Sequence, residues 1–298
     1  MKKPNFFIAG VSKCGTTSLH NYMDLHPDVF MSGTKEPHYF IKDILEFPHK
    51  GPGDRQRKNI VDSIEEYREL FQDVTHEKIV GESSADYLYY SDSAEKIKAY
   101  SPDAKIVFIL RNPVDRAYSA YTHLTRDGRE TKEFEYALEK EEERKRNNYG
   151  CLWHLKSMGL YFSSLKHFMD VFGEGNIKVI ISEEFKRDSH KVLNEICDFL
   201  NIDHFDEEKL NLMNYNVSGI PKNKKLFSLL RNKTVTSVVK IFVSDSEKRE
   251  NLKNLLYSRL LKKENINPAT REKLIDYFYS DIKKLEELLD TSLDHWLK

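Results

Sequence analysis

The stretch FFIAGVSKCGTTSLHNYM at residues 6–23 restricts the fold of this chain more than any other segment. It begins as a continuous apolar run, which is typical of a buried parallel strand. It then turns between Gly10 and Gly15 and continues with apolar residues at helical spacing. A glycine loop between a strand and a helix N-terminus offers backbone N–H groups to an anion. The stretch predicts a phosphate-type binding loop in an α/β fold, and the alternative is a glycine turn with a solvated lysine.

The position of the lysine separates this loop from the loop of ATPases and GTPases. That loop reads G-x-x-x-x-G-K-[ST], with the lysine directly after the second glycine. Here Gly10 and Gly15 have the same spacing, but Thr16 follows Gly15 and the lysine of the loop is Lys13. A nucleotide-dependent kinase is therefore disfavoured, also because no acidic run after the second predicted strand is placed for magnesium. A non-catalytic nucleotide-binding module is an alternative from another class of protein.

Further apolar segments alternate with helical patterns along the chain. The predicted strands cover residues 5–10, 28–32, 78–84, 104–113 and 176–185. The predicted helices include residues 63–71, 160–173, 188–202 and about 269–289. This alternation favours a mostly parallel sheet with helices on both faces, whose ligands bind at the carboxyl ends of the strands. Because the sequence holds no internal repeat and no low-complexity linker, residues 1–298 are predicted to form a single domain.

Two more segments carry groups suited to anions. Arg111 ends the apolar run AKIVFILRNP, and Ser119 follows eight residues later in a helix that Asn112 caps and Pro113 begins. The arginine fork suits phosphate oxygens, although an arginine at a strand end also serves as a salt-bridge partner. The run SGIPKNKK at residues 218–225 is rich in lysine, which by itself is typical of a solvated face.

Composition argues against several classes of protein. The formal net charge is −1, so no global field favours nucleic acid or an anionic membrane as a partner. No apolar run approaches the roughly 20 residues of a membrane-spanning helix. Three scattered cysteines predict a reducing, cytoplasmic location without structural disulfides. No Cys/His spacing suggests a metal site, and nothing in the sequence encodes an oligomeric state.

Several motifs occur together in an order that resembles a known family. VSKCGTTSL resembles the loop for the 5′ end of 3′-phosphoadenosine 5′-phosphosulfate (PAPS) in sulfotransferases, and IVFILRNPVDRAYSAYTHL resembles the family's 3′-phosphate segment. KEPHYF at residues 35–40 resembles the KE-x-H-F-F stretch of the carbohydrate, heparan-sulfate type, and MGLYFSSLKHF and SGIPKNKK follow the same pattern. The chain is therefore similar to the PAPS-dependent sulfotransferases, as a bacterial member. The resemblance implies a P-loop-like parallel sheet flanked by helices, PAPS as co-substrate and no metal.

The resemblance also implies roles in binding the donor. Lys13 is expected to bind the 5′-phosphate and to stabilise the leaving bridging oxygen. Arg111 and Ser119 are expected to hold the 3′-phosphate. The residues expected to cradle the 5′-phosphate are Cys14, Gly15, Thr16, Thr17 and Ser18. Those expected to close a loop over the nucleotide are Gly219, Ile220, Pro221, Lys222 and Asn223.

The matched position of Glu36 in KEPHYF implies a general base. A sugar hydroxyl is a poor nucleophile, and a positioned carboxylate takes its proton as the new S–O bond forms. The implied reaction moves a sulfuryl group to a hydroxyl of a carbohydrate or glycolipid, and a phenol or small alcohol is the alternative acceptor. His38 is the alternative base.

Other residues near these motifs leave their roles open. The family often has a lysine after the glutamate of the third strand, whereas GESSADY has Ser83 there. Glu82 is expected to be structural, to position other groups, to bind acceptor, or to pair with Lys13 or Arg111. The charged residues 129–148 predict a solvated helix and loop. Three residues predicted to lie either at the acceptor site or in the core are Trp153, His154 and Tyr161.

Overall fold

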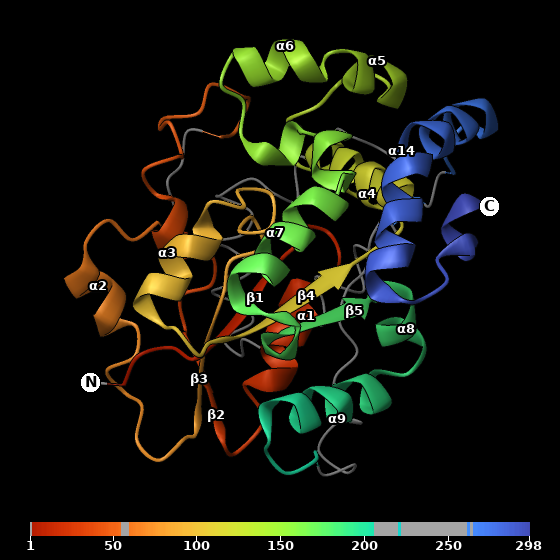
Figure 1. Cartoon of the computed structure of the whole chain (residues 1–298). Helices are drawn as coiled ribbons and strands as arrows, with labels where there is room; N and C mark the ends of the chain where they lie inside the picture. Colours follow the sequence, from red (N-terminus) through yellow and green to blue (C-terminus); the bar gives the residue numbers. More distant parts are fainter. Residues whose placement is uncertain (1, 55–59, 206–219, 222–260, 263–264) are drawn as a thin grey trace, which may run out of the picture.

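The computed structural model describes residues 2–54, 60–205, 220–221, 261–262 and 265–298. Its centre is a five-stranded sheet in which all neighbouring strands are parallel (Figure 1). In spatial order the strands are β2 (Val29–Met31), β3 (Ile79–Ser83), β1 (Phe6–Gly10), β4 (Lys105–Leu110) and β5 (Ile177–Ile181). This confirms the predicted parallel α/β sheet, while a single domain over residues 1–298 stays a prediction.

The strands form where continuous apolar runs were found because both faces of the sheet are covered. Every residue of β1 and β3 is buried, as is every residue of β4 after Lys105. The prediction for 176–185 was wrong at its end, since β5 stops at Ile181 and residues 182–187 form helix α8. The sequence turns polar there, and Glu183 and Glu184 lie in the first helical turn, where the helix dipole favours acidic groups.

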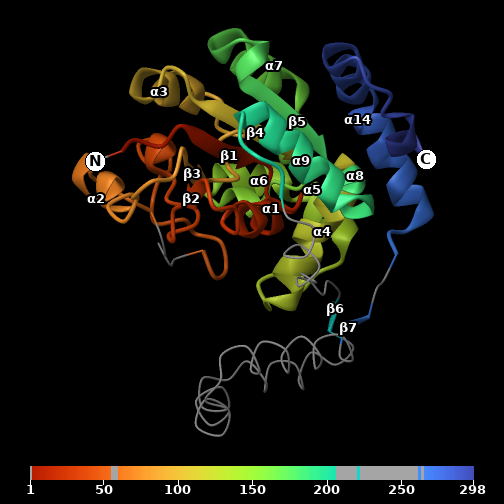
Figure 2. The ribbon, with the colours of Figure 1, turned by 90° about the horizontal axis from the view of Figure 1, so that it is seen from below.

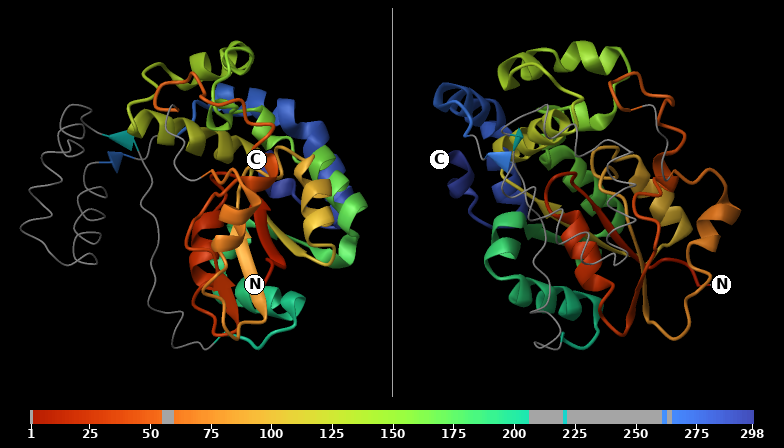
Figure 3. Two further views of the ribbon diagram at one scale, coloured as in Figure 1. Left: turned by 90° about the vertical axis from the view of Figure 1, so that its left-hand side faces the viewer. Right: turned by 180° about the vertical axis from the view of Figure 1, so that it is seen from behind.

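Helices cover the two faces of the sheet. Figures 2 and 3 show α1 (Thr16–Met23) on one face and α3 (Ser93–Tyr100) and α7 (Phe162–Phe172) on the other. α14 (Pro268–Leu289) packs against α7 and α4 (Pro113–Arg126), and α8 (Ser182–Arg187) and α9 (Ser189–Leu200) pack beside β5. The other α-helices of the described segments are α2 (Ile64–Glu69), α5 (Phe134–Glu139) and α6 (Glu141–Arg146). The 3-10 turns in those segments are η1 (Tyr39–Ile41), η2 (Cys151–Trp153), η3 (Ser157–Gly159), η4 (Glu174–Asn176) and η5 (Asp294–Leu297).

The charged segment 129–148 is only partly solvated, contrary to the prediction. Glu141 is fully buried and accepts hydrogen bonds from the N–H groups of Lys156 and Ser157. Glu130 is also buried and forms an ion pair with Arg144 at 2.5 Å. These carboxylates are buried because each has a backbone or cationic partner, which offsets the cost of removing a charge from water.

The aromatic residues that were predicted for either the core or the acceptor site lie in the core. Trp153 and Tyr161 are both 1% exposed, and His154 is buried as well. The Tyr161 hydroxyl donates to the carbonyl of Arg111 at 3.0 Å, so this side chain supports the backbone at the end of β4. Arg116, which the helical pattern puts off the apolar face of α4, is also fully buried and donates to the Leu155 carbonyl.

The predicted nucleotide-closing loop is described only at two positions. Ile220 and Pro221 form the short strand β6 (Ile220–Pro221), which pairs antiparallel with β7 (Leu261–Lys262). β6 lies beside α4, the helix that carries Ser119 (Figure 2). The other members of the predicted loop, Gly219, Lys222 and Asn223, lie outside the described residues.

Replacing Asn112 with alanine is expected to lower the free energy of unfolding by about 1–2 kcal/mol. Its Oδ1 accepts from the N–H groups of Val114 and Asp115 and caps α4, and its buried Nδ2 donates to the Trp296 carbonyl. Urea denaturation measures the change. Asn267→Ala is the matched control because Asn267 caps α14 at an exposed site. It should lower the free energy of unfolding by less than Asn112→Ala does. Equal losses would show that the bond to Trp296 adds nothing.

Candidate functional site

The predicted site segments meet at one edge of the sheet. Lys13 follows β1, the segment from Lys35 to His38 follows β2, and Arg111 follows β4. The segment from Ser84 to Asp86 follows β3. Because the strands are parallel, all four segments lie at the carboxyl edge, where α/β sheets bind ligands.

Backbone strain is concentrated at this edge. Six non-glycine residues in the described part of the chain have a positive φ, and three of them are Asn or Asp, which tolerate that region. The other three are Lys13 (φ 74), Glu36 (φ 59) and His38 (φ 53). Side chains rarely adopt this conformation, and such residues cluster where a site requires them. The strain therefore marks the same residues that the sequence motifs predicted.

The loop after β1 presents a helix N-terminus. Gly15 is the N-cap residue of α1 with φ 116, a conformation that requires glycine, and an added Cβ would also approach Ile109 Cδ1 at 3.3 Å. Its carbonyl accepts the helical bond from the Leu19 N–H. The first turn of α1 holds no acidic residue, unlike those of α2, α3 and α4. The positive end of the helix dipole is thus left without a carboxylate of its own helix, which suits an anion.

The cradle residues differ in exposure. Thr17 is exposed, Ser18 is partly exposed and Thr16 is buried. The thiol of Cys14 is buried, which raises its pKa to about 11, and its N–H donates to the Val11 carbonyl. Cys14 therefore shapes the turn, and the helix N-terminus that follows it offers the backbone donors.

The Lys13 side chain contacts the helix α4. Its Nζ lies 3.2 Å from Nδ1 of His123, and Arg126 Nη2 lies 2.7 Å from the same nitrogen. His123 Nε2 faces Asp127 at 3.5 Å, so the tautomer with Nε2 protonated leaves Nδ1 as an acceptor. Burial, together with the positive charges of Arg126 and Arg111, lowers the pKa of Lys13 to about 8. A phosphate placed here would find a lysine already held among cationic groups.

Arg111 lies beside the same loop. Its Nη1 donates to the Lys13 carbonyl at 3.2 Å. Its Nε is buried and has no hydrogen-bond partner in the described segments. A buried guanidinium donor without a partner is costly unless a ligand satisfies it. Ser119 lies in α4 and is partly exposed, and the 3′-phosphate remains a prediction for both residues.

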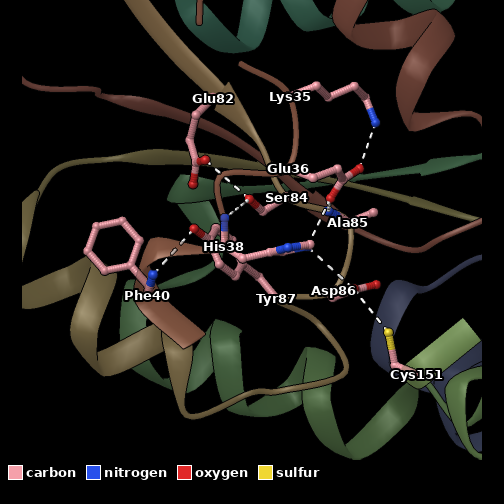
Figure 4. Close-up of polar contacts among 10 residues, drawn as sticks. All are labelled: Lys35, Glu36, His38, Phe40, Glu82, Ser84, Ala85, Asp86, Tyr87 and Cys151. Carbon is pink, nitrogen blue, oxygen red and sulfur yellow. Dashed lines mark hydrogen bonds and ion pairs between the residues drawn. The ribbon is translucent and has the colours of Figure 1, made fainter. Parts of the chain in front are cut away.

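Glu36 accepts two hydrogen bonds and lies within ion-pair distance of an imidazole at the end of β2 (Figure 4). Lys35 Nζ donates to Oε1 at 2.6 Å, the Ala85 N–H donates to Oε2 at 2.8 Å, and His38 Nε2 lies 3.2 Å from Oε2. Burial alone would raise the pKa of Glu36, but the close contact of the His38 imidazole and the charge of Lys35 outweigh burial and hold the pKa well below its usual range. Glu36 is therefore an ionised carboxylate at neutral pH.

His38 lies between two carboxylates. Its Nε2 is 3.3 Å from Asp86 Oδ2 as well as 3.2 Å from Glu36 Oε2 (Figure 4). Burial opposes a charge here, but the close contacts with the Asp86 and Glu36 carboxylates raise the pKa of His38 to about 10. His38 is thus an imidazolium at neutral pH and has no lone pair with which to accept a proton.

Glu82 lies beneath this cluster. It is fully buried, and burial raises its pKa to about 8. Ser84 Oγ donates to Glu82 Oε2 at 3.2 Å and accepts from the His38 N–H at 3.2 Å. The contact of Glu82 is this hydrogen bond from Ser84, and the ion pair with Lys13 or Arg111 that was one of the expected roles is not formed in the described part of the chain. Glu82 therefore supports the backbone of the His38 loop.

Sequence reasoning missed four residues of the site. Lys35 contacts Glu36, and Asp86 contacts His38. Cys151 Sγ donates to Asp86 Oδ2 at 3.1 Å. His123 contacts Lys13. Lys35 was visible in the KEPHYF motif. Asp86 follows the third strand, which is a position where ligand-binding residues gather. Nothing in the sequence indicated Cys151.

The described segments contain neither a metal-binding cluster nor a membrane-spanning helix. Over the segments that the structure describes, no group of three or more His, Cys, Asp or Glu side chains is placed to hold a metal ion. No helix in those segments is long and apolar enough to cross a membrane. The three cysteines are free thiols.

Curated proteins are similar to this chain in sequence. Carbohydrate sulfotransferase 15 of Mus musculus is 25% identical over 263 residues, which cover 70% of this chain and 46% of that protein. Heparan sulfate glucosamine 3-O-sulfotransferase 3A1 of Mus musculus is 28% identical over 222 residues, which cover 74% of this chain and 51% of that protein. The chain thus spans about half the length of the curated relatives it matches.

A solved structure and a family model extend the comparison. The crystal structure of a sulfotransferase from Alicyclobacillus acidocaldarius superposes with a TM-score of 0.78 at 34% identity and covers 100% of both chains. The model of the sulfotransferase family matches residues 4–207, which contain the whole parallel sheet and the site described above. This chain belongs to the sulfotransferase family.

Proposed function

We propose that this chain transfers the sulfuryl group of PAPS to a hydroxyl of a carbohydrate or glycolipid, with Glu36 as general base. The observation that carries the proposal is the ionised Glu36 carboxylate, held at the same sheet edge as the Lys13 loop. A carboxylate fixed beside an anion-binding loop suits a reaction in which a hydroxyl loses its proton while an anionic group is transferred.

The donor side supports the proposal through groups that fit two phosphates. Lys13 and the N-terminus of α1 suit the 5′-phosphate, because they combine one positive charge with backbone donors. Arg111 suits the 3′-phosphate, because its buried Nε lacks a partner in the described residues. Together, these two sets of groups fit a nucleotide that carries a 3′-phosphate and a 5′-phosphate.

The chemistry assigns each group a separate task. The acceptor oxygen forms a bond to sulfur while the bond from sulfur to the bridging oxygen of the 5′-phosphate breaks. Glu36 takes the hydroxyl proton, and Lys13 stabilises the charge that grows on the bridging oxygen. Transfer through a loose, sulfur-trioxide-like species would require mainly positioning and charge stabilisation, as in phosphoryl transfer. His38, as an imidazolium, is not the base in this scheme.

The acceptor class rests on the relatives. Two of them are named for carbohydrate and heparan sulfate sulfotransfer. KEPHYF, which resembles the motif of the heparan-sulfate type, carries the general base of the proposal. A cytoplasmic location stays a prediction from the cysteine pattern.

Thermal unfolding with two nucleotides tests the donor. Adenosine 3′,5′-bisphosphate is expected to raise Tm without a metal, and ATP with magnesium is expected to have little effect. Transfer of labelled sulfate from PAPS across glycans, glycolipids and phenols then tests the acceptor. Stabilisation by ATP and magnesium alone would overturn the donor assignment, and transfer to phenols alone would overturn the acceptor class.

Replacing Arg111 with alanine is expected to weaken binding of the bisphosphate by about 2–4 kcal/mol, since a charge-assisted bond pair to the 3′-phosphate is lost. Calorimetric titration measures the change. Adenosine 5′-phosphate, which lacks the 3′-phosphate, serves as the control ligand and should lose little affinity. Equal losses for both nucleotides would assign Arg111 a structural role.

A further inference from the structure

A chain of side chains runs from Glu36 away from the donor loop. His38 contacts both Glu36 and Asp86, and Asp86 Oδ2 also accepts the thiol hydrogen of Cys151 (Figure 4). These residues come from three separate places: the segment after β2, the segment after β3, and η2. Asp86 and His38 are each 15% exposed at the side chain, so their contact is shielded from water.

From this chain we infer that Asp86 is a positioning residue, which holds the His38 imidazolium against Glu36 and so fixes the direction of the base. The inference rests on the proposed role of Glu36. Asp86 itself does not touch the reacting atoms in this scheme. Its carboxylate acts through His38, and Cys151 holds the carboxylate in turn.

The free lone pair of Glu36 shows why the direction matters. A carboxylate has about four acceptor positions on its two oxygens. Lys35 and the Ala85 N–H occupy one position on each oxygen, and His38 Nε2, which lies 3.2 Å from Oε2 as an ion-pair partner, covers a third. One position is left to receive the acceptor proton. If His38 turned away, Glu36 could rotate about its side chain, and the remaining position would no longer face one direction.

The charges around His38 explain why one carboxylate is not sufficient to keep the imidazolium paired throughout the reaction. The groups that face it are Glu36 in its own segment, Asp86 and Glu82 from β3 and the segment after it, and Cys151 from η2 through Asp86. Lys35 adds a second positive charge at Glu36. When Glu36 takes the acceptor proton, it stops balancing His38. Asp86 is then the remaining close carboxylate that keeps the imidazolium paired, so His38 need not move during the reaction.

Cys151 has a weaker part in the same arrangement. Burial raises the pKa of its thiol well above the usual range, so the thiol stays protonated and donates to Asp86. Cys151→Ser keeps a donor and is expected to keep turnover within about twofold. Cys151→Ala removes the donor and is expected to lower turnover more than the serine variant does. Equal turnover in both variants would remove Cys151 from the arrangement.

The main test reads the protonation of His38 directly and needs no acceptor. Nitrogen NMR of the histidine rings follows the titration, with the His38 signal assigned by its loss in His38→Gln. In the wild type, His38 should stay protonated through pH 9, because its pKa is about 10. In Asp86→Asn its midpoint should fall by more than one pH unit, since a carboxylate partner is gone. An unchanged midpoint in Asp86→Asn would overturn the inference.

Asp170→Asn is the matched control for charge. It removes a carboxylate from an exposed pair with Lys166 on α7, at 2.8 Å. This variant should leave both the His38 titration and turnover unchanged. Asp86→Glu keeps a carboxylate, so its His38 midpoint should lie between those of Asp86→Asn and the wild type.

Turnover provides the second readout. Asp86→Asn is expected to lower kcat about 10- to 100-fold, the range seen when outer partners of metal-bound histidines are removed. KM for PAPS should not change. The loss should grow as pH rises through the lowered His38 midpoint, because neutral His38 no longer pairs with Glu36 as a cation. A purely structural role would instead lower kcat by one factor at every pH.

The outcomes separate this inference from the proposed function. If Glu36→Gln abolishes transfer while Asp86→Asn keeps wild-type turnover, Asp86 is not a positioning residue and the proposed function stands. If the wild type transfers no sulfuryl group from PAPS to any acceptor, the proposed function fails. In that case the NMR titration still decides whether Asp86 holds His38 as an imidazolium.

Discussion

Glu36→Gln is expected to lower turnover by about 10²–10⁴, the usual contribution of a general base. Glutamine has the same shape and keeps one side-chain oxygen, so either Lys35 or the Ala85 N–H can still donate to it, but the amide cannot take the acceptor proton. Donor affinity should stay near the wild-type value because Glu36 is assigned to the acceptor side. The rate of labelled sulfate transfer with saturating PAPS measures the loss, and binding of the 3′,5′-bisphosphate checks the donor site.

The pH profile decides between Glu36 and His38 as the base. Because the pKa of Glu36 is held far below its usual range, the wild-type rate should show no acidic limb near neutral pH. If His38 were the base, the rate would instead rise with pH towards its pKa of about 10, and His38→Ala would remove that limb. Glu36→Gln with most of the wild-type rate, or an alkaline limb that only His38→Ala abolishes, would contradict the assignment of Glu36.

Lys13→Ala is expected to lower kcat by a hundredfold or more, the scale of losing one group that stabilises charge in the transition state. Alanine suits this position as a probe, because it keeps the Cβ of lysine and adds no new strain at φ 74. Single-turnover transfer with saturating PAPS measures the effect. Lys166→Ala, at an exposed pair on α7, is the control and should leave kcat unchanged. Near-normal turnover in Lys13→Ala would contradict its role.

The titration of Lys13 adds a pH dependence to donor binding. Burial lowers its pKa to about 8, so the charged form is lost as pH rises through that value in the donor-free protein. A bound phosphate favours the charged form, so bisphosphate affinity should fall as pH rises above about 8 in the wild type. This fall should be absent in Lys13→Ala, which has no such group to titrate. An equal fall in both proteins would assign the pH dependence to another group.

Local patterns predicted the parts of the site that are continuous in sequence. The apolar run before Gly10 and the glycine spacing predicted β1 and the α1 N-terminus, and Asn112 and Pro113 predicted the start of α4. These features depend on neighbouring residues alone, through strand burial, glycine conformation and capping. The prediction for residues 182–185 was wrong because a polar turn of helix follows directly on the strand without a break in the pattern.

Charged residues were harder to predict, because exposure depends on distant partners. Glu141 belongs to a charged run that is typical of a solvated surface. It is nevertheless buried, and the N–H groups of Lys156 and Ser157 donate to its carboxylate. Glu82 was expected to be able to pair with Lys13 or Arg111, but its contact is Ser84, which also accepts from the His38 N–H. Sequence spacing does not state which of several nearby cations or hydroxyls a buried carboxylate will contact.

The sequence by itself predicted the parallel α/β sheet and the glycine loop between β1 and α1, and its motifs named Lys13, Arg111 and Glu36 as candidate residues. Only the tertiary structure decided their chemical state. Lys13 meets His123 across 110 residues of chain, and the Ala85 N–H meets Glu36 across 49. The charge of His38, the ionisation of Glu36 and the lowered pKa of Lys13 all follow from such contacts and from burial. A pKa depends on distances and on the exclusion of water, and both are fixed only when segments far apart in sequence come together.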